Sequence, residues 1–255
     1  MKTNRLKSLL SSGQPARGAW LGIPSTSSAR LLSRLTLDWL VIDAEHAPID
    51  AQTLSGMVAA IAEADGPAPL VRIAQATLEN VKKALDAGAY GVIAPMINTK
   101  EEAEQVVAWA KFPPEGQRSF GSAYAGLAFG QSKDEYLRLA NQQTLVGVQI
   151  ESQAALANLE AIFSVKGLDL AFVGPIDLSI SLGLEALPEN PHPRFQAALA
   201  QIIQSANQHG IPLGIFCSDG KAALERICQG FQFVSIASDT GGLVRFIQSE
   251  LDSSR

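Results

Sequence analysis

The strongest constraint on the fold is a short apolar run that recurs eight times, each time followed by a stretch with helical periodicity. The eight strand-like runs are Gly18–Gly22, Trp39–Asp43, Leu70–Ile73, Gly91–Ala94, Leu145–Ile150, Leu170–Val173, Leu213–Phe216 and Phe233–Ile236. Nearly continuous apolar strands that alternate with helices form parallel sheets covered on both faces. Eight such units in 255 residues favour a closed (β/α)8 TIM barrel of one domain over an open sheet.

Capping residues support the helical stretches between these runs. The stretch 77–88 has Thr at its start, Glu in its first turn and Gly at its end, which is typical of a helix with both ends capped. Similar helices are predicted to start near Ser25, Asp50, Thr99, Ser152, Pro193, Ser218 and Asp239. Only the polar ends, residues 1–12 and 252–255, have the composition of disordered segments.

One segment, Lys111 to Asn141, interrupts the alternation between the fourth and fifth units. It is rich in alanine and glycine and is predicted to contain a short helix from Lys133 to Leu139. Long loops on a compact scaffold often serve the active site. We therefore expect one barrel domain over residues 1–255, with a lid-like insertion at about 111–141 over the carboxyl-terminal rim.

Composition narrows the range of partners and compartments. The net charge is −5 and there is no basic run, which argues against binding to nucleic acid or anionic lipid. The two cysteines, Cys217 and Cys228, match neither a zinc motif nor a disulfide framework, so a reducing cytoplasm is expected. No apolar stretch has the length of a signal peptide core or a membrane span. We expect a small-molecule substrate and association with further copies of the chain.

Two acids follow neighbouring strand-like runs. Glu151 comes directly after the fifth run and Asp177 shortly after the sixth, so both are expected at the same rim. Two carboxylates with no nearby Cys or His suit a hard octahedral cation such as Mg²⁺ or Mn²⁺. The alternative is that each acid only caps the helix that follows it.

A histidine and an arginine are expected on the same rim. His46 follows the second run beside Asp43 and Glu45, and a neighbouring carboxylate would support it as a general base. The alternative is a structural histidine bonded to a backbone carbonyl. Arg72 ends the third run, where its charge can stabilise an enolate or a carboxylate. An ion pair of Arg72 with Asp43 or Glu45 is the alternative, and the two roles are compatible.

Backbone amides and lysines add two further arguments. The segment 174–179 places amides at a predicted helix start beside the two acids, where they can bind a carboxylate or a phosphate. A phosphate cup at 238–242 is disfavoured because Asp239 would repel the anion. A Schiff-base mechanism is also disfavoured, since Lys166 precedes a strand-like run and Lys221 lies inside a predicted helix.

Six ordered blocks between Gly18 and Gly242 closely resemble the HpcH/HpaI family of metal-dependent, class II pyruvate aldolases. They are Asp43-Ala44-Glu45-His46-Ala47-Pro48, Val71-Arg72, Ala89-Tyr90-Gly91-Val92-Ile93-Ala94-Pro95, Pro113-Pro114-Glu115-Gly116-Gln117-Arg118, Gln149-Ile150-Glu151 and Val173-Gly174-Pro175-Ile176-Asp177-Leu178-Ser179. The resemblance implies a lyase that reversibly cleaves a 4-hydroxy-2-keto acid into pyruvate and an aldehyde.

The resemblance also implies a role for each site residue. It makes Glu151 and Asp177 the ligands of a divalent cation, Mg²⁺, Mn²⁺ or Co²⁺. Arg72 would stabilise the pyruvate enolate, and His46 would be the base, aided by Asp43 and Glu45. Pyruvate would be held by Gln149 and by the Gly174-Pro175-Ile176-Asp177 segment through the amides of Ile176 and Asp177, with Trp20 lining the pocket, Arg118 as a further substrate-binding candidate, and Asp86 reaching His46 from a neighbouring subunit. Family members are commonly homo-hexamers, built as dimers of trimers with exchanged C-terminal helices.

The chain departs from the family in one place. Many members carry a further arginine several residues beyond the Gly-x-Arg element, where an acidic aldehyde can meet it, but residues 122–128 contain none. Neutral or hydroxylated aldehydes are therefore expected to compete well with acidic ones. The alternative is that Arg118, or an arginine from a neighbouring subunit, supplies the missing charge. Two alternatives remain open at this point: a lyase or decarboxylase acting on another 2-keto acid such as oxaloacetate through the same enolate, and a non-catalytic pyruvate-binding oligomer.

Overall fold

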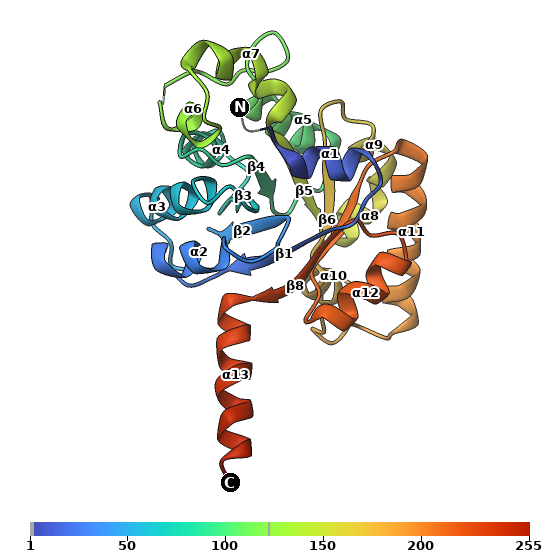
Figure 1. The fold of residues 1–255 in the computed structure, drawn as a ribbon. Helices are drawn as coiled ribbons and strands as arrows, with labels where there is room; N and C mark the ends of the chain where they lie inside the picture. The colour runs from blue at the N-terminus through green and yellow to red at the C-terminus, as the bar shows by residue number, and fades with distance from the viewer. Residues whose placement is uncertain (1–2, 122) are drawn as a thin grey trace.

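The computed structural model describes residues 3–121 and 123–255, and its strands form a closed parallel barrel (Figure 1). Each strand pairs with the next one in the chain, and the last pairs with the first. The strands are β1 Ala16–Leu21, β2 Trp39–Asp43, β3 Ala68–Arg72, β4 Gly91–Ala94, β5 Leu145–Ile150, β6 Leu170–Val173, β7 Leu213–Ile215 and β8 Phe233–Ser238. The predicted (β/α)8 barrel is confirmed, and every predicted strand lies within two or three residues of an observed one.

The chain also forms helices, most of which pack around the outside of the barrel. They are α1 Arg5–Ser11, α2 Thr26–Leu32, α3 Ala51–Ala62, α4 Leu78–Asp86, α5 Lys100–Ala110, α6 Tyr124–Ala128, α7 Lys133–Gln143, α8 Gln153–Ala157, α9 Leu159–Phe163, α10 Pro175–Ser181, α11 Pro193–His209, α12 Gly220–Cys228 and α13 Asp239–Ser253. Side chains of Ser25, Thr77 and Thr99 accept amide protons at the predicted helix starts, which explains why those boundaries were readable. Within the described residues no helix has the length and apolar character needed to cross a membrane.

Alternate strand residues build two apolar layers. Leu40 and Ile42 of β2 face the surrounding helices, whereas Trp39 and Val41 belong to the interior cluster. Trp39 stacks on Phe233 with 3.9 Å between ring centroids, so aromatic rings fill the amino-terminal half of the barrel.

The N-terminal segment is ordered, contrary to the expectation of a disordered end. Leu6 and Leu10 of α1 are buried in the interior cluster. The Asn4 side-chain amide donates to the carbonyl oxygens of Tyr90 and Gln143 at 3.1 and 2.8 Å. The α1 helix therefore closes the amino-terminal end of the barrel; Met1 and Lys2 lie outside the described residues. At the other end of the chain, residues 252 and 253 continue α13.

The insertion does not lie over the carboxyl-terminal rim of its own barrel, so the prediction of a lid there is wrong for a single chain. It follows a helix rather than a strand, and the chain leaving α5 is already at the amino-terminal end. There Phe129 stacks on Tyr90, just before β4, at 3.9 Å, and the Tyr90 hydroxyl donates to the Ala128 carbonyl at 3.0 Å. Figure 1 shows α6 and α7 gathered near α4 and the N-terminus. The helix α6 was not predicted, α7 is longer than predicted, and Ser122 lies outside the described residues.

The last helix, α13, leaves the body of the molecule and extends alone (Figure 1). None of its residues is buried. Its large exposed apolar side chains are Leu243, Val244, Phe246, Ile247 and Leu251. Large exposed apolar patches are uncommon on single-chain soluble proteins and are typical of interaction surfaces.

Candidate active site

A cavity of about 400 Å³ opens at the carboxyl-terminal ends of the strands. Its lining residues are Trp20, Gly22, Asp43, His46, Arg72, Gln149, Phe172, Gly174, Pro175, Ile176, Asp177, Phe216, Ser238 and Thr240. Most of the predicted site residues are in this set. Parallel strands place their carboxyl ends on one rim, which explains how blocks scattered through the sequence meet.

Glu151 is a buried carboxylate at the end of β5, with 3% of its surface exposed. One oxygen accepts the backbone N–H of Met96 at 2.7 Å, and the other accepts the side-chain amide of Gln149. Burial raises the pKa of Glu151 to about 7, and the nearby charges of Asp177 and Glu45 act in the same direction. A positive charge close to Glu151 would therefore stabilise the ionised form of its carboxylate.

A glycine makes room for that carboxylate. A Cβ at Gly174 would come 2.2 Å from the Glu151 Oε2 atom, so a side chain at this position would displace the acid. Gly174 is also the N-cap of α10, with Pro175 in the first turn. Because Gly174 offers no side chain to cap the helix, the first amides stay available to a ligand.

The helix-cap alternative for the two acids does not hold. Ser152 rather than Glu151 caps α8, accepting the N–H of Ala155. Asp177 lies in the first turn of α10 and lines the cavity. Within residues 3–121 and 123–255 no group of three or more His, Cys, Asp or Glu side chains is arranged to hold a metal ion. The pair of acids would therefore need water or substrate oxygens to complete a coordination shell, and an oxygen-only set of this kind fits a hard divalent cation.

Arg72 is clamped by two acids. Its Nε and Nη2 atoms donate to the two oxygens of Asp43 at 2.9 and 2.6 Å, and its Nη1 lies 3.2 Å from Glu45 Oε2. The guanidinium carbon lies 4.8 Å from the ring centre of Trp20. The predicted ion pair of Arg72 with Asp43 and Glu45 is confirmed. It holds the guanidinium group at the cavity wall, and it is compatible with a second role of Arg72 in stabilising an enolate or a carboxylate.

His46 stands at the mouth of the cavity with an exposed side chain. Its Nε2 atom is 3.8 Å from Glu45 Oε2, which makes Glu45 the nearer acid. Asp43 instead accepts the backbone N–H groups of Glu45 and His46 at 3.1 and 3.2 Å. Asp43 therefore fixes the turn that carries the imidazole rather than the ring itself. Among the described residues the ring makes no hydrogen bond to a backbone carbonyl, so the structural alternative finds no support.

Glu45 interacts electrostatically both with His46 and with the acids Asp43 and Asp177. Burial raises its pKa, while Arg72 and His46 oppose that rise and Asp43 and Asp177 add to it. Its carboxylate is thus held among charges of both signs, close to every ionisable group of the cavity.

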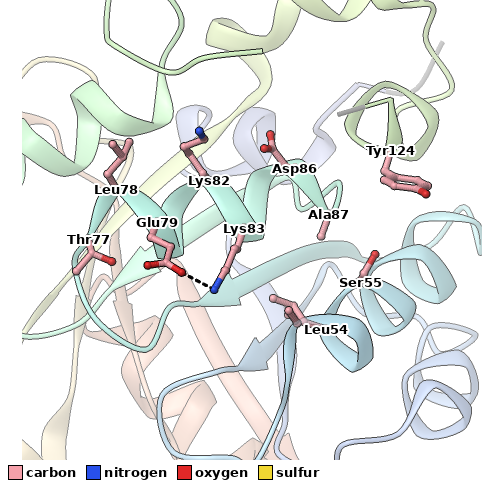
Figure 2. Close-up of a pocket in the computed structure, with 11 residues that line it drawn as sticks. Leu54, Ser55, Thr77, Leu78, Glu79, Lys82, Lys83, Asp86, Ala87 and Tyr124 are labelled. Carbon is pink, nitrogen blue, oxygen red and sulfur yellow. Dashed lines mark ion pairs between the residues drawn. The ribbon is translucent and has the colours of Figure 1, made fainter. Parts of the chain in front are cut away.

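Arg118 and Asp86 lie away from the cavity of their own chain. Arg118 is buried, with Nη1 2.9 Å from the Tyr136 hydroxyl, Nη2 3.2 Å from Asp86, and its guanidinium over the Phe112 ring at 4.6 Å. Asp86 ends α4 at the amino-terminal side and borders a separate groove of about 710 Å³ between α3, α4 and α6, shown in Figure 2. Arg118 consequently does not contact substrate within one chain, and a role for Asp86 at His46 would need another chain.

The cavity also contains residues that were not predicted. Gly22, Phe172, Phe216, Ser238 and Thr240 line it. All stand in or just after β1, β6, β7 or β8, and taking every strand end of a closed barrel as part of the rim would have found them.

Comparison with known proteins agrees with this geometry. The HpcH/HpaI aldolase/citrate lyase family matches the chain over residues 17–245. The chain belongs to this family. A hydroxypyruvate/pyruvate aldolase of Rhizorhabdus wittichii is 39% identical, with 92% of each chain covered. A 4-hydroxy-2-oxo-heptane-1,7-dioate aldolase of Escherichia coli is 38% identical, with 95% of this chain and 91% of the relative covered.

A solved structure agrees as well. The crystal structure of an HpcH/HpaI aldolase/citrate lyase family protein from Burkholderia cenocepacia has a TM-score of 0.91 and 37% identity, covering 99% of this chain and 100% of the other. The predicted family and the predicted carbon–carbon lyase class are confirmed.

Proposed function

We propose that this HpcH/HpaI family member is a pyruvate aldolase that reversibly cleaves a 4-hydroxy-2-keto acid into pyruvate and an aldehyde. The observation that carries the proposal is that His46, the ion-paired Arg72 and Asp177 line one cavity. Glu151 lies buried behind this lining, within electrostatic reach of Asp177. The names of the two aldolase relatives support the same chemistry.

The residues divide the reaction between them. As the C3–C4 bond breaks, His46 accepts the proton of the 4-hydroxyl group, and the bonding electrons pass to C3 to form an enolate. The positive charge of Arg72 stabilises the enolate oxygen. Return of a proton to C3 completes pyruvate, and the aldehyde leaves. Gln149 and the amides of Ile176 and Asp177 hold the keto acid, and Trp20 packs beside it.

Glu151 and Asp177 would hold the divalent cation, Mg²⁺, Mn²⁺ or Co²⁺. When bound, that ion supplies a Lewis acid for the negative charge that develops on the keto oxygen. The buried, high-pKa carboxylate of Glu151 supports this assignment, because a neighbouring cation would favour its ionised form.

The cavity favours neutral or hydroxylated aldehydes. Arg72 is the one Lys or Arg among the described residues that line it, and Asp43 and Glu45 already pair with it. Phe172, Phe216 and Trp20 contribute apolar walls. A carboxylate at the far end of an aldehyde therefore gains little within one chain.

We further propose that the working form is a homo-hexamer, a dimer of trimers, in the cytoplasm. The exposed ring of His46 supports the approach of Asp86 from a neighbouring subunit, and the uncovered apolar stripe of α13 supports helix exchange. Both cysteines are free, as suits a reducing compartment.

A condensation screen tests the function. The protein is incubated with pyruvate, Mn²⁺ and a panel of aldehydes, and products are identified by mass spectrometry. We expect 4-hydroxy-2-keto acids from glycolaldehyde and glyceraldehyde, and none when a chelator is present. A parallel arm measures pyruvate release from oxaloacetate. Release from oxaloacetate without any condensation would replace the aldolase assignment with a decarboxylase, and no product in either arm would contradict both.

A further inference from the structure

We propose that Asp239, which no part of the mechanism above uses, is a positioning residue that sets the shape of the aldehyde side of the cavity. The inference rests on the proposed aldolase function and deepens it. It concerns the junction where β8 passes into α13, next to the loop that follows β1.

The Asp239 carboxylate joins two distant parts of the chain. Its Oδ1 accepts the backbone N–H of Gly22 at 2.8 Å, and its Oδ2 accepts that of Ile23 at 3.1 Å. Oδ1 also accepts the N–H of Thr240 at 2.7 Å. Hydrogen bonds to an ionised acceptor are stronger than neutral ones, so one side chain holds the β1 loop to the start of α13.

These bonds go beyond an ordinary helix cap. Ser238 is the N-cap of α13, and its hydroxyl oxygen accepts the N–H of Gly241 at 3.1 Å. Asp239 instead directs both oxygens at the β1 loop.

The joined segments form one wall of the cavity. Gly22, Ser238 and Thr240 all line it. The wall is closely packed, because a Cβ at Gly22 would stand 3.3 Å from Thr240 Cγ2 and 3.7 Å from Asp239 Oδ1. A shift of the β1 loop would therefore change the shape of the cavity directly.

The wall is also the hydroxyl-bearing part of the cavity. Ser238 and Thr240 are the hydroxyl side chains among its described lining residues, and their oxygens lie 3.3 Å apart. One O–H can bond within the pair, which leaves the other to donate to a ligand. A hydroxylated aldehyde offers the matching groups.

Barrel topology separates this wall from the groups that hold pyruvate. In the closed order β1 to β8, β1 stands opposite β5, the strand that precedes Glu151, and β8 is two strands from β6. The pyruvate half of the substrate is assigned to the acids after β5 and β6. The aldehyde half then meets the wall that Asp239 fixes.

The test separates the two halves of the reaction. Exchange of the C3 protons of pyruvate with solvent deuterium, with Mn²⁺ present, reports the pyruvate half alone. The kcat and KM for glycolaldehyde in condensation report both halves. For Asp239→Ala we expect a rise of about tenfold in the KM for glycolaldehyde, with exchange within about twofold of wild type. Asp239→Asn keeps one acceptor oxygen and should show a smaller rise, about threefold.

A matched control is available in Asp219. Its carboxylate also accepts two backbone amides, those of Lys221 and Ala222, both at 2.9 Å, at the start of α12. It does not line the cavity. Asp219→Asn should leave both exchange and the glycolaldehyde KM within about twofold of wild type.

Several results would overturn the proposal. If proton exchange falls in parallel with condensation in the Asp239 variants, the role of Asp239 is a general structural one. If the KM for glycolaldehyde is unchanged, Asp239 does not shape the cavity. If Asp239→Ala does not fold, as judged by circular dichroism, Asp239→Asn and Thr240→Val decide. Thr240→Val should raise the KM for glycolaldehyde several-fold more than that for propionaldehyde, and an equal effect on both aldehydes counts against the wall. Failure of wild type to exchange or condense would instead refute the proposed function itself.

Discussion

At the scale of single residues, the ionised form of Glu151 that the proposed metal site needs lowers the stability of the metal-free fold. Glu151 is buried beside other acids, in a space that a side chain at residue 174 would fill. A charge in that position costs folding free energy unless a cation compensates it.

That cost predicts a stabilising substitution. Burial raises the pKa of Glu151 to about 7 from an ordinary value of 4.5. Ionising it therefore destabilises the metal-free fold; the cost is absent below pH 4.5, grows between 4.5 and 7, and is complete above 7. Glu151→Gln should unfold in chelator at pH 8 with a free energy higher by about 1–3 kcal/mol, and should match wild type near pH 4.5.

Urea titration at the two pH values measures this effect. The new amide can donate to Gln149 Oε1, which has no hydrogen-bond partner within the described residues. The variant should also lose aldol activity. A lower stability at pH 8 would show that the carboxylate is not under electrostatic strain.

His46 provides the second residue-level prediction. His46→Ala should lower the turnover of aldol cleavage by about 10²- to 10⁴-fold, the usual contribution of a positioned base, because the 4-hydroxyl proton loses its acceptor. Metal affinity, measured by calorimetry with Mn²⁺, should be kept. A variant within a few-fold of wild type would move the base to Glu45, its nearest acid.

The site residues were partly readable from the sequence. The acids, the histidine and Arg72 stand at the ends of apolar runs or a few residues beyond them, so strand ends predicted their meeting. The sequence did not show which acid orients His46, because Asp43 is used by the Arg72 clamp and the turn, and that division depends on side-chain geometry. Nor did it show Ser238 and Thr240, whose position depends on closure of the barrel between β8 and β1.

At the scale of elements, the insertion is held to the amino-terminal end by a buried charge. Arg118 lies between Asp86 of α4 and Tyr136 of α7, with 1% of its side chain exposed. These contacts tie α7 to the barrel.

Removing one of those contacts should loosen the fold without touching the chemistry. Tyr136→Phe leaves a buried guanidinium N–H without its acceptor, which should cost about 1–3 kcal/mol of unfolding free energy. Thermal and urea unfolding measure the loss, with C3 proton exchange of pyruvate as the control that should stay unchanged at 25 °C. An unaltered melting temperature would mean that water replaces the hydroxyl.

Strands and helices were predicted correctly where the sequence signal was local. The prediction failed where the position of a segment depended on the fold as a whole. Most strands combined an apolar run with a helix whose start is capped by a side chain, and those signals lie close together in the sequence. The insertion lies at the other end from the one predicted because it follows α5 rather than a strand, and a helix in a parallel barrel returns the chain to the amino-terminal end. The helix α6 arose in an alanine- and glycine-rich stretch, where tertiary packing of Ala125 rather than propensity decides.

At the scale of the whole molecule, α13 predicts that assembly depends on its apolar stripe. Phe246→Asp places a charge where we expect a buried contact between chains, and it should weaken association by about 100-fold or more. Light scattering across a dilution series measures the shift to smaller species. Ser249→Asp, an exposed polar position on the same helix, is the matched control and should keep the wild-type mass. Equal masses for both variants would remove α13 from the interface.

The placement of the insertion at the end opposite the cavity also matters for adaptation. In a lineage under selection, substitutions around Arg118 can change the temperature at which the protein survives, while substitutions around Gly22 and Thr240 change which aldehyde it accepts. The two kinds of change occur at opposite faces of the barrel, so one can accumulate without first undoing the other. A mutagenesis library confined to the insertion should thus yield proteins of higher thermal stability and unaltered substrate preference. A library confined to the β8–α13 junction should yield proteins of altered substrate preference and unaltered thermal stability.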